Sequence, residues 1–209
     1  MKIKKIKNGK LSTNSYLVYN EDLEALIIDP ADDTEKIINT IDELNLKLKY
    51  IVNTHGHSDH VAGNKDLADK YNCEIIISKK DAAMLERPSD NLSLYLGIKG
   101  EQPSPDRLVE ENDVIKLGDI KLVVIETPGH TKGSVSLFEQ TRDVLFSGDT
   151  LFHRSVGRTD LPGGSIPDLL NSLKKLFNLP GRVTVYPGHS ETTKIEFERE
   201  NNPFAKKLG

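Results

Sequence analysis

Short apolar runs separated by polar breaks extend along the chain, and four of these runs stop at a histidine or an aspartate. They are rich in β-branched residues and cover residues 50–54, 122–125, 144–148 and 183–188, ahead of His55, His130, Asp149 and His189. Apolar runs of this length that are bounded by Gly and Pro predict buried strands. Layered α/β proteins commonly build a site from groups that several strand ends deliver to one edge. The pattern therefore predicts such a protein, with a site at these strand ends.

The remaining periodic segments predict further strands and helices. Alternating Lys and Ile over residues 2–7 predict a half-exposed strand, and residues 14–19 and 25–29 predict the next strands of an antiparallel meander. Apolar positions with helical spacing predict helices over residues 61–71, 166–177 and 194–200, a short helix over 79–86, and one that begins at a capping box of Asp32 and Glu35. The expected caps are Ser58 or Asp59 for the first of these helices and Ser165 for the second.

Two segments lack this periodicity. Residues 87–106 and 152–164 are rich in Pro, Gly or charged residues. We expect the first to be either a lid or binding loop or a loop folded over a core edge, and the second to be a loop at the rim of the site. Pro-Gly-His occurs at 128–130 and again at 187–189, each time after a predicted strand. This echo fits a fold of two similar halves.

Composition narrows the class of protein and its partners. With 209 residues, 36% hydrophobic and 29% charged, the chain is expected to form a single globular domain over residues 1–209. A formal charge of −4 gives no general attraction to nucleic acid or to an acidic membrane surface. No run approaches the roughly 18 to 20 apolar residues that cross a bilayer. We therefore expect a small-molecule substrate, no nucleic-acid or membrane partner, and a monomer or homodimer.

The N-terminal lysines and the single cysteine indicate the compartment. Residues 1–7 are basic but lack the apolar core of a secretory signal, and Cys73 has no second cysteine with which to form an intrachain disulfide. We predict a cytoplasmic protein, with Cys73 as a buried, inert side chain.

The stretch from His55 to His60 places three imidazoles and one carboxylate within six residues. Burial of these groups without a ligand would leave unsatisfied polar atoms, each costing about 1–3 kcal/mol. Imidazole and carboxylate suit zinc or ferrous iron, and the single cysteine excludes all-sulfur structural sites, so we expect an open, catalytic site. His55 and His57, with Gly56 allowing a sharp turn between them, would bind one ion, and Asp59 and His60 a second. The ligands expected to complete the two sites are His130 and His189, with Asp149 bridging.

The order of these motifs strongly resembles the metallo-β-lactamase superfamily. His-x-His-x-Asp-His is followed by Gly-His-Thr, Ser-Gly-Asp-Thr and Pro-Gly-His, and the resemblance spans nearly the whole chain. Within that superfamily, the chain most resembles the short bacterial type II glyoxalase-like (hydroxyacylglutathione hydrolase-like) enzymes. The segments that carry this resemblance are residues 148–152, 157–164, 191–193 and 202–204. The implied fold is α/β, a four-layer αββα sandwich of two mixed β-sheets.

The resemblance also implies a mechanism. A hydroxide shared between two divalent metal ions, zinc in the first place and iron or manganese as alternatives, would attack a hydroxyacyl-glutathione-like thioester. Metal binding lowers the pKa of bound water to near 7, which provides the nucleophile at neutral pH. Asp59 would be a ligand of the second ion and a catalytic residue that orients the nucleophile.

Substrate contacts are expected in the second rim loop. Longer glyoxalases have a segment similar to Gly-Lys-x-Tyr where this chain has Gly157-Arg158-Thr159-Asp160. The positive charge of the lysine is kept by Arg158, whereas the tyrosine is replaced by Asp160. The candidate substrate-binding residues are Arg158, His153 and Asp160. Arg158 and Asp160 could equally pair with each other and shape the loop.

Other functions fit the same residues. A mononuclear iron persulfide dioxygenase would hold one iron on His55, His130 and Asp149. A hydrolase of another ester, lactone or phosphoester, and a non-enzymatic module in which the metal only holds the fold, are further alternatives. A β-lactamase is disfavoured, since several such enzymes use a cysteine at the position of Asp149. Nucleic-acid processing is disfavoured by the acidic charge balance.

Overall fold

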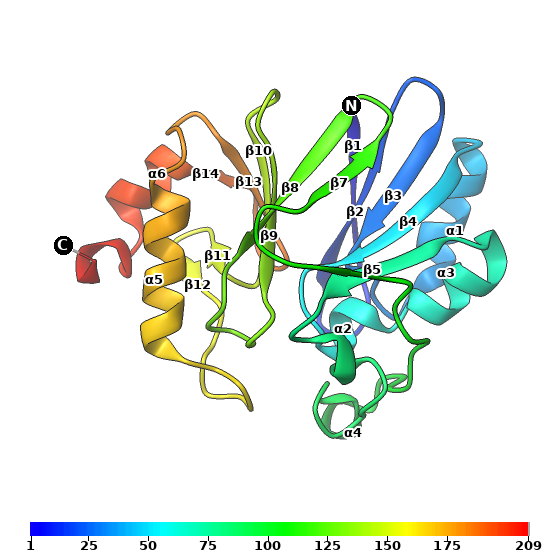
Figure 1. Cartoon of the computed structure of the whole chain (residues 1–209), viewed down its shortest axis with the longest axis horizontal. Coiled ribbons are helices and arrows are strands. Elements are labelled where there is room, and N and C mark those ends of the chain that lie inside the picture. The colour runs from blue at the N-terminus through cyan, green and yellow to red at the C-terminus, as the bar shows by residue number, and fades with distance from the viewer. Residues whose placement is uncertain (209) are drawn as a thin grey trace. The chain divides into compact units, whose positions relative to one another are not determined.

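The computed structural model describes residues 1–208, which form two compact units (Figure 1). One unit comprises Met1–Val109 with Lys116–Ile120, and the other Glu110–Ile115 with Lys121 onward. The single domain expected from the length stays a prediction. Among the described residues, no helix combines the length and the apolar character that crossing a membrane would need.

The first unit contains a six-stranded mixed sheet. Its strands follow chain order: β1 (Lys2–Asn8), β2 (Thr13–Tyr19), β3 (Glu24–Ile28), β4 (Lys47–Asn53), β5 (Glu74–Ser78) and β6 (Arg107–Val109). β1 to β3 form the predicted antiparallel meander, whereas β3 to β6 pair in parallel. Parallel neighbours need crossover connections, and helices provide the first two of them. The C-terminal ends of β3 and β4 therefore lie side by side.

The helices of this unit are α1 (Thr34–Glu43), α2 (Ser58–Val61), α3 (Asn64–Tyr71) and α4 (Ser93–Leu96), with a 3₁₀ turn η1 (Ala82–Met84). α1 buries Ile37 and Ile41, and α3 buries Leu67, in one apolar cluster with Ile51 and Ile75 of the sheet. Burial of an aliphatic side chain of this size contributes about 1.5–3 kcal/mol. The predicted apolar stripes therefore attach the helices to the sheet.

Local predictions about helix starts were partly wrong. The predicted capping box fails because Asp32 Oδ1 accepts a hydrogen bond from the Lys10 amide (3.1 Å), while α1 begins after Asp33 with no side-chain cap. The helix predicted over residues 61–71 is two helices, α2 and α3, and neither Ser58 nor Asp59 caps them. The break lies at Gly63, where a Cβ would be 2.8 Å from the Ala31 carbonyl oxygen. Close packing of another segment thus interrupts the helix. The helix predicted over 79–86 shortens to η1.

The second sheet is also mixed and six-stranded. Its order is β14 (Thr193–Lys194), β13 (Thr184–Pro187), β10 (Val144–Gly148), β9 (Val135–Glu139), β8 (Ile120–Glu126) and β7 (Val114–Leu117). β10 and β13 are parallel, and their pairings with β9 and β14 are antiparallel. A separate hairpin joins β11 (Leu151–Phe152) to β12 (Ser155–Val156).

Helices α5 (Ile166–Phe177) and α6 (Ile195–Asn201) and a 3₁₀ turn η2 (Ala205–Lys207) accompany this second sheet. α5 has the predicted bounds, and Ser165 Oγ accepts a hydrogen bond from the Asp168 amide (3.3 Å), which confirms the predicted cap. Leu169 and Leu173 pack with Val185 in the apolar cluster of this unit. Two mixed sheets, each with its own helices, confirm the predicted α/β fold class.

Candidate metal centre

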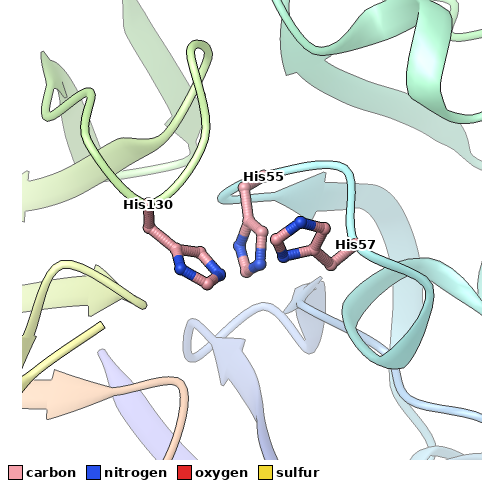
Figure 2. A group of neighbouring side chains, drawn as sticks. All are labelled: His55, His57 and His130. Carbon is pink, nitrogen blue, oxygen red and sulfur yellow. The ribbon is translucent and has the colours of Figure 1, made fainter. Parts of the chain in front are cut away.

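In the first unit, four predicted ligands lie together where β4 ends. β4 stops at Asn53, and the chain passes through His55 and His57 into the short helix α2, which contains Asp59 and His60. All four residues are at most 5% exposed. The ring centroid of His55 lies 4.8 Å from that of His57 and 4.2 Å from that of His60. Figure 2 shows the His55 and His57 rings beside each other at this turn. The structure thus brings these four residues together in one buried cluster.

The turn through Gly56 depends on space. A Cβ at this position would lie 2.6 Å from the Met84 Cβ, and the Gly56 amide donates a hydrogen bond to Asp81 Oδ2 (3.1 Å). The glycine that separates His55 from His57 is therefore required because η1 and the residue before it pack closely against it.

Asp29 accepts three hydrogen bonds behind this cluster. Its Oδ1 accepts from the Thr54 amide (2.7 Å), and its Oδ2 accepts from the Thr54 hydroxyl (2.7 Å) and from His60 Nδ1 (3.0 Å). Thr54 Oγ1 is also 3.1 Å from His55 Nδ1. Asp29 is 1% exposed and has a φ of 51°, a left-handed conformation that is uncommon for a residue other than glycine.

Three further buried polar residues hold the cluster. The Thr13 hydroxyl donates to Asp59 Oδ2 (3.0 Å), and the Asn53 side-chain Nδ2 donates to the His60 backbone carbonyl (3.3 Å). The Ser58 backbone amide donates to the Asn91 backbone carbonyl (2.8 Å). Asn91 lies in the 87–106 loop, so that loop is attached directly to the predicted ligand stretch.

In the second unit, three predicted ligands lie at strand ends. His130 follows β8, Asp149 follows β10, and His189 follows β13. His130 Nε2 lies 3.6 Å and His189 Nε2 lies 3.5 Å from Asp149 Oδ2. Because β10 and β13 are parallel, with the Gly188 amide donating to the Gly148 carbonyl (2.9 Å), Asp149 and His189 leave the sheet together. His130 is drawn in Figure 2 on the loop that follows β8.

Contacts with the 157–164 loop orient His130. Its Nδ1 donates to the Arg158 carbonyl (2.7 Å), which leaves Nε2 directed toward Asp149. Gly157 permits this contact, since a Cβ there would lie 1.8 Å from the Asp149 carbonyl oxygen. A backbone group of the predicted substrate loop thus positions a predicted metal ligand.

The donor chemistry fits divalent metal ions. The separations between imidazole Nε2 and carboxylate Oδ2 are 3.4 Å for His60 and Asp59, and 3.6 and 3.5 Å for His130 and His189 with Asp149. These exceed ordinary N–H to O hydrogen bonds of about 2.7–3.2 Å. They approach the distance of about 3.3 Å between two ligands of one tetrahedral zinc whose bonds are about 2.0–2.1 Å. The residues present therefore fit metal ions within each unit.

The candidate substrate residues make contacts of their own. Arg158 Nε and Nη2 each donate to one oxygen of Asp160 (both 2.7 Å), and both side chains are exposed. The Arg158 guanidinium lowers the pKa of Asp160 to about 2, and this pairing raises the pKa of Arg158. The His153 ring packs on Phe197 of α6, with the centroids 5.2 Å apart. Roles in substrate binding stay predictions for all three residues.

Sequence reasoning missed several neighbours of the predicted ligands. Asp29 ends an apolar run as Asp149 does, so the same signal could have found it. Phe152, the last residue of β11, packs edge-on against His189, with centroids 6.0 Å apart, whereas His153 lies in the turn after β11 and packs on Phe197. Thr13 carries no local signal, because only folding brings it to Asp59.

Comparisons with known proteins give consistent matches. The family model described as Metallo-beta-lactamase superfamily matches residues 8–189. A relative from Haemophilus influenzae, named hydroxyacylglutathione hydrolase GloC, is 34% identical over 91% of this chain and 92% of its own length. The crystal structure of BLEG-1, named a B3 metallo-beta-lactamase, has a TM-score of 0.93 and 38% identity over 97% of this chain and 99% of that one. TTHA1623, solved in a di-iron-bound form, has a TM-score of 0.88 and 33% identity over 96% and 99% of the two chains.

Proposed function

Because the chain belongs to the metallo-beta-lactamase superfamily, whose members are generally metal-dependent hydrolases, we propose that it is a binuclear thioesterase for a hydroxyacyl-glutathione-like substrate. The observation that carries the proposal is the set of imidazoles and carboxylates spaced as metal ligands in both units, all of them buried except the half-buried His189. The choice of a thioester is supported by the relative named hydroxyacylglutathione hydrolase.

The proposal assigns the ligands to two ions. His55, His57 and His130 would hold one ion, and Asp59, His60 and His189 would hold the other. Asp149 would bridge them. Two bound divalent ions, zinc in the first place, would supply a water of lowered pKa and polarise the substrate carbonyl.

The residues of the chain would provide orientation and proton handling. The Thr13 hydroxyl fixes the Asp59 carboxylate through its Oδ2, and a carboxylate held in this way can accept the hydrogen bond that aligns an attacking water. Arg158 would meet a carboxylate of the substrate by exchanging its partner Asp160. The exchange requires little energy because exposed ion pairs contribute little to stability. His153 and Asp160 would border the same substrate.

The proposal also covers the cellular setting. We propose a small-molecule substrate and a monomer or homodimer. A net charge of −4 supports the lack of nucleic-acid or membrane partners, and a single cysteine supports a cytoplasmic location.

Metal analysis followed by activity assays tests the proposal. The protein is purified without added metal, its metal content is measured, and the same sample is assayed with S-lactoylglutathione. We expect two ions per chain and thioester hydrolysis. His57→Ala should lose metal and activity and keep its circular dichroism spectrum, whereas the metal-dependent folding module would lose its structure. One tightly held ion without thioesterase activity would contradict the proposal.

A second candidate is the iron persulfide dioxygenase. It is favoured by the similarity to the solved structure of ETHE1 from Myxococcus xanthus, a persulfide dioxygenase, which is 30% identical over 97% of this chain with a TM-score of 0.81. Iron also suits the same ligands. One iron on His55, His130 and Asp149 would consume oxygen in the presence of glutathione persulfide. The discriminating measurement is oxygen uptake by anaerobically iron-loaded protein, and an absence of uptake eliminates this candidate.

The similarity to BLEG-1 adds a third substrate to the same assay. A chromogenic β-lactam is offered under identical conditions. If the protein hydrolyses the β-lactam faster than the thioester, the proposed substrate becomes a β-lactam instead of a thioester.

A further inference from the structure

Two C-terminal segments that carry the resemblance to glyoxalase-like enzymes, residues 191–193 and 202–204, have no role in the proposed chemistry, yet both reach one buried side chain, Glu198 of α6. We propose that Glu198 and Asn202 are positioning residues that hold the tip of the β11–β12 hairpin, and that the hairpin held in this way forms one wall of the substrate site. The inference rests on the proposed function and deepens it, because it assigns control of substrate binding to the C-terminal helix.

The β11–β12 hairpin is too short to hold its own shape. Each of its strands has only two residues, and an isolated two-stranded hairpin is marginally stable at best in water. The favoured two-residue loops need a positive φ at the first loop position. Here the loop residues are His153 and Arg154, and only the second, Arg154, is left-handed, with a φ of 56°. A partner outside the hairpin must therefore hold this turn.

Glu198 provides that partner. It is fully buried, and its Oε2 accepts hydrogen bonds from the Arg154 backbone amide (2.9 Å) and from Asn202 Nδ2 (2.8 Å). Its Oε1 accepts from the Thr193 hydroxyl (2.7 Å). Hydrogen bonds to a buried carboxylate are among the stronger ones, and a carboxylate that loses a donor there is costly. One side chain thus joins α6, β14 and the turn of the hairpin.

Further contacts with the hairpin tip come from the same helix and its C-cap. Asn202 Nδ2 also donates to the Ser155 backbone carbonyl (3.0 Å). The His153 ring lies 5.2 Å from the ring of Phe197, and the Arg154 guanidinium lies 5.5 Å from the centre of that ring. α6 and its C-cap therefore hold two consecutive backbone groups of the tip and pack against the side chains of both loop residues.

The hairpin connects the surroundings of two proposed metal ligands. Its residue Phe152 packs edge-on against His189, with ring centroids 6.0 Å apart. Two residues after its end, the Arg158 carbonyl lies 2.7 Å from His130 Nδ1. A hairpin that left α6 would have to return before the substrate could fit beside these ligands. When only a fraction of the protein is competent to bind, apparent affinity falls by that fraction while the bound state is unchanged. A loosened hairpin therefore raises KM and spares kcat.

Three substitutions separate positioning from a general loss of stability. Glu198→Ala removes the acceptor of the Arg154 amide, so that amide should exchange about 10- to 100-fold faster. KM should rise about 10-fold, with kcat within about threefold of wild type. Glu198→Gln should restore both, because its oxygen can accept from Arg154 and Asn202 while its NH2 donates to the Thr193 hydroxyl. Thr193→Val is the matched control: it cuts the bond of the same carboxylate to β14 and leaves the hairpin contacts, so it should lower the melting temperature and keep the wild-type KM.

The test combines amide hydrogen exchange with kinetics on zinc-loaded protein. Exchange of the Arg154 amide, resolved by NMR, reports the state of the hairpin directly. Hydrolysis of S-lactoylglutathione gives KM and kcat separately. The metal content of each variant is measured, so that a lost ion is not mistaken for a displaced hairpin.

Three results overturn the inference. They are a wild-type Arg154 amide that exchanges as fast as an exposed turn, a Glu198→Ala variant with faster exchange but an unchanged KM, and a Thr193→Val variant whose KM rises as much as that of Glu198→Ala. If Glu198→Ala does not fold, the wild-type exchange rate and Asn202→Ala decide, since Asn202→Ala keeps the carboxylate and loses the hold on Ser155.

Failure of the proposed function gives a different result. Wild-type protein that hydrolyses no thioester refutes the thioesterase, whatever the hairpin does. The hold of Glu198 on the hairpin is then judged on exchange alone, where unchanged protection of the Arg154 amide in Glu198→Ala overturns it.

Discussion

The buried amide pair of Asn53 and Asn64 links the end of β4 to the start of α3. Asn53 Nδ2 donates to Asn64 Oδ1 (3.1 Å), Asn64 Nδ2 donates to Asn53 Oδ1 (2.7 Å), and Asn53 Nδ2 also reaches the His60 carbonyl. Both side chains are at most 1% exposed. Asn64→Ala removes both reciprocal bonds and leaves Asn53 Oδ1 buried without its donor.

The expected loss of stability follows from these contacts. Each lost hydrogen bond removes about 0.5–1.5 kcal/mol, and a buried acceptor left unsatisfied costs about 1–3 kcal/mol. These terms overlap, so we expect the free energy of unfolding to fall by about 2–4 kcal/mol, within the range for loss of a buried polar network. For a chain of this length, 1 kcal/mol shifts the melting temperature by about 2–4 °C, so the decrease should be about 4–16 °C.

Thermal and urea unfolding of the metal-free proteins measure this change without a contribution from bound ions. Asn201→Ala is the matched control, because Asn201 is exposed and donates only to the Phe197 carbonyl, and its effect should stay within about 0.5 kcal/mol. The double variant Asn53→Ala, Asn64→Ala should cost less than the sum of the single changes. An Asn64→Ala variant as stable as Asn201→Ala would refute the reasoning that this pair joins β4 to α3.

Four further outcomes are expected. Burial raises the pKa of the Cys73 thiol to about 11, so native protein should resist alkylation at pH 8 while urea-unfolded protein reacts, and rapid native labelling would contradict this. Because the pKa is raised, the contribution of the Cys73 thiol to stability is intact at pH values below the ordinary thiol pKa near 9 and is lost as the pH rises toward 11. Cys73→Ala should remove this decline from unfolding curves measured at alkaline pH. Arg158 lowers the pKa of Asp160 to about 2, so the pair's contribution is present above the ordinary value and lost only as the pH falls through 2; a carboxyl NMR titration of Asp160 with its midpoint near 4 would show that the pair is absent. Gly157→Ala forces a methyl group against the Asp149 carbonyl, so it should destabilise the protein by about 1–3 kcal/mol and weaken metal binding. Gly181→Ala is the control, because the added methyl group would lie 3.1 Å from the exposed Glu196 side chain, and it should change stability and metal binding little.

Local sequence patterns predicted those parts of the fold that neighbouring residues decide. The apolar stripe and serine cap of α5 gave its exact bounds, and the apolar run before Asp149 gave β10, because period and cap are properties of a few adjacent residues. The imidazole and carboxylate ligands between His55 and His60 could be predicted for the same reason, because they lie within six adjacent residues. The strand-end pattern predicted a layered α/β protein, whereas the two mixed sheets were implied by the resemblance of the motifs to a known superfamily.

Features decided by distant contacts could not be read in this way. Nothing near Gly63 in the sequence announces that the Ala31 carbonyl packs against it, and that contact divides the predicted helix. Asp32 fits a capping box by spacing, but the Lys10 amide competes for its carboxylate. Thr13 reaches Asp59 across 46 positions, so its contribution to the site becomes visible only in the folded chain.

The parallel pairing of β10 with β13 sets the distance between Asp149 and His189. Strands in a sheet are spaced about 4.8 Å apart whatever connects them, so the separation of these two residues does not depend on the 39 positions between them in the sequence. The β11–β12 hairpin, the 157–164 loop and α5 all belong to that connection. Insertions or exchanges in the hairpin can therefore reshape the surroundings of the site while the spacing of Asp149 and His189 is conserved, which makes the hairpin the natural place to graft a new specificity.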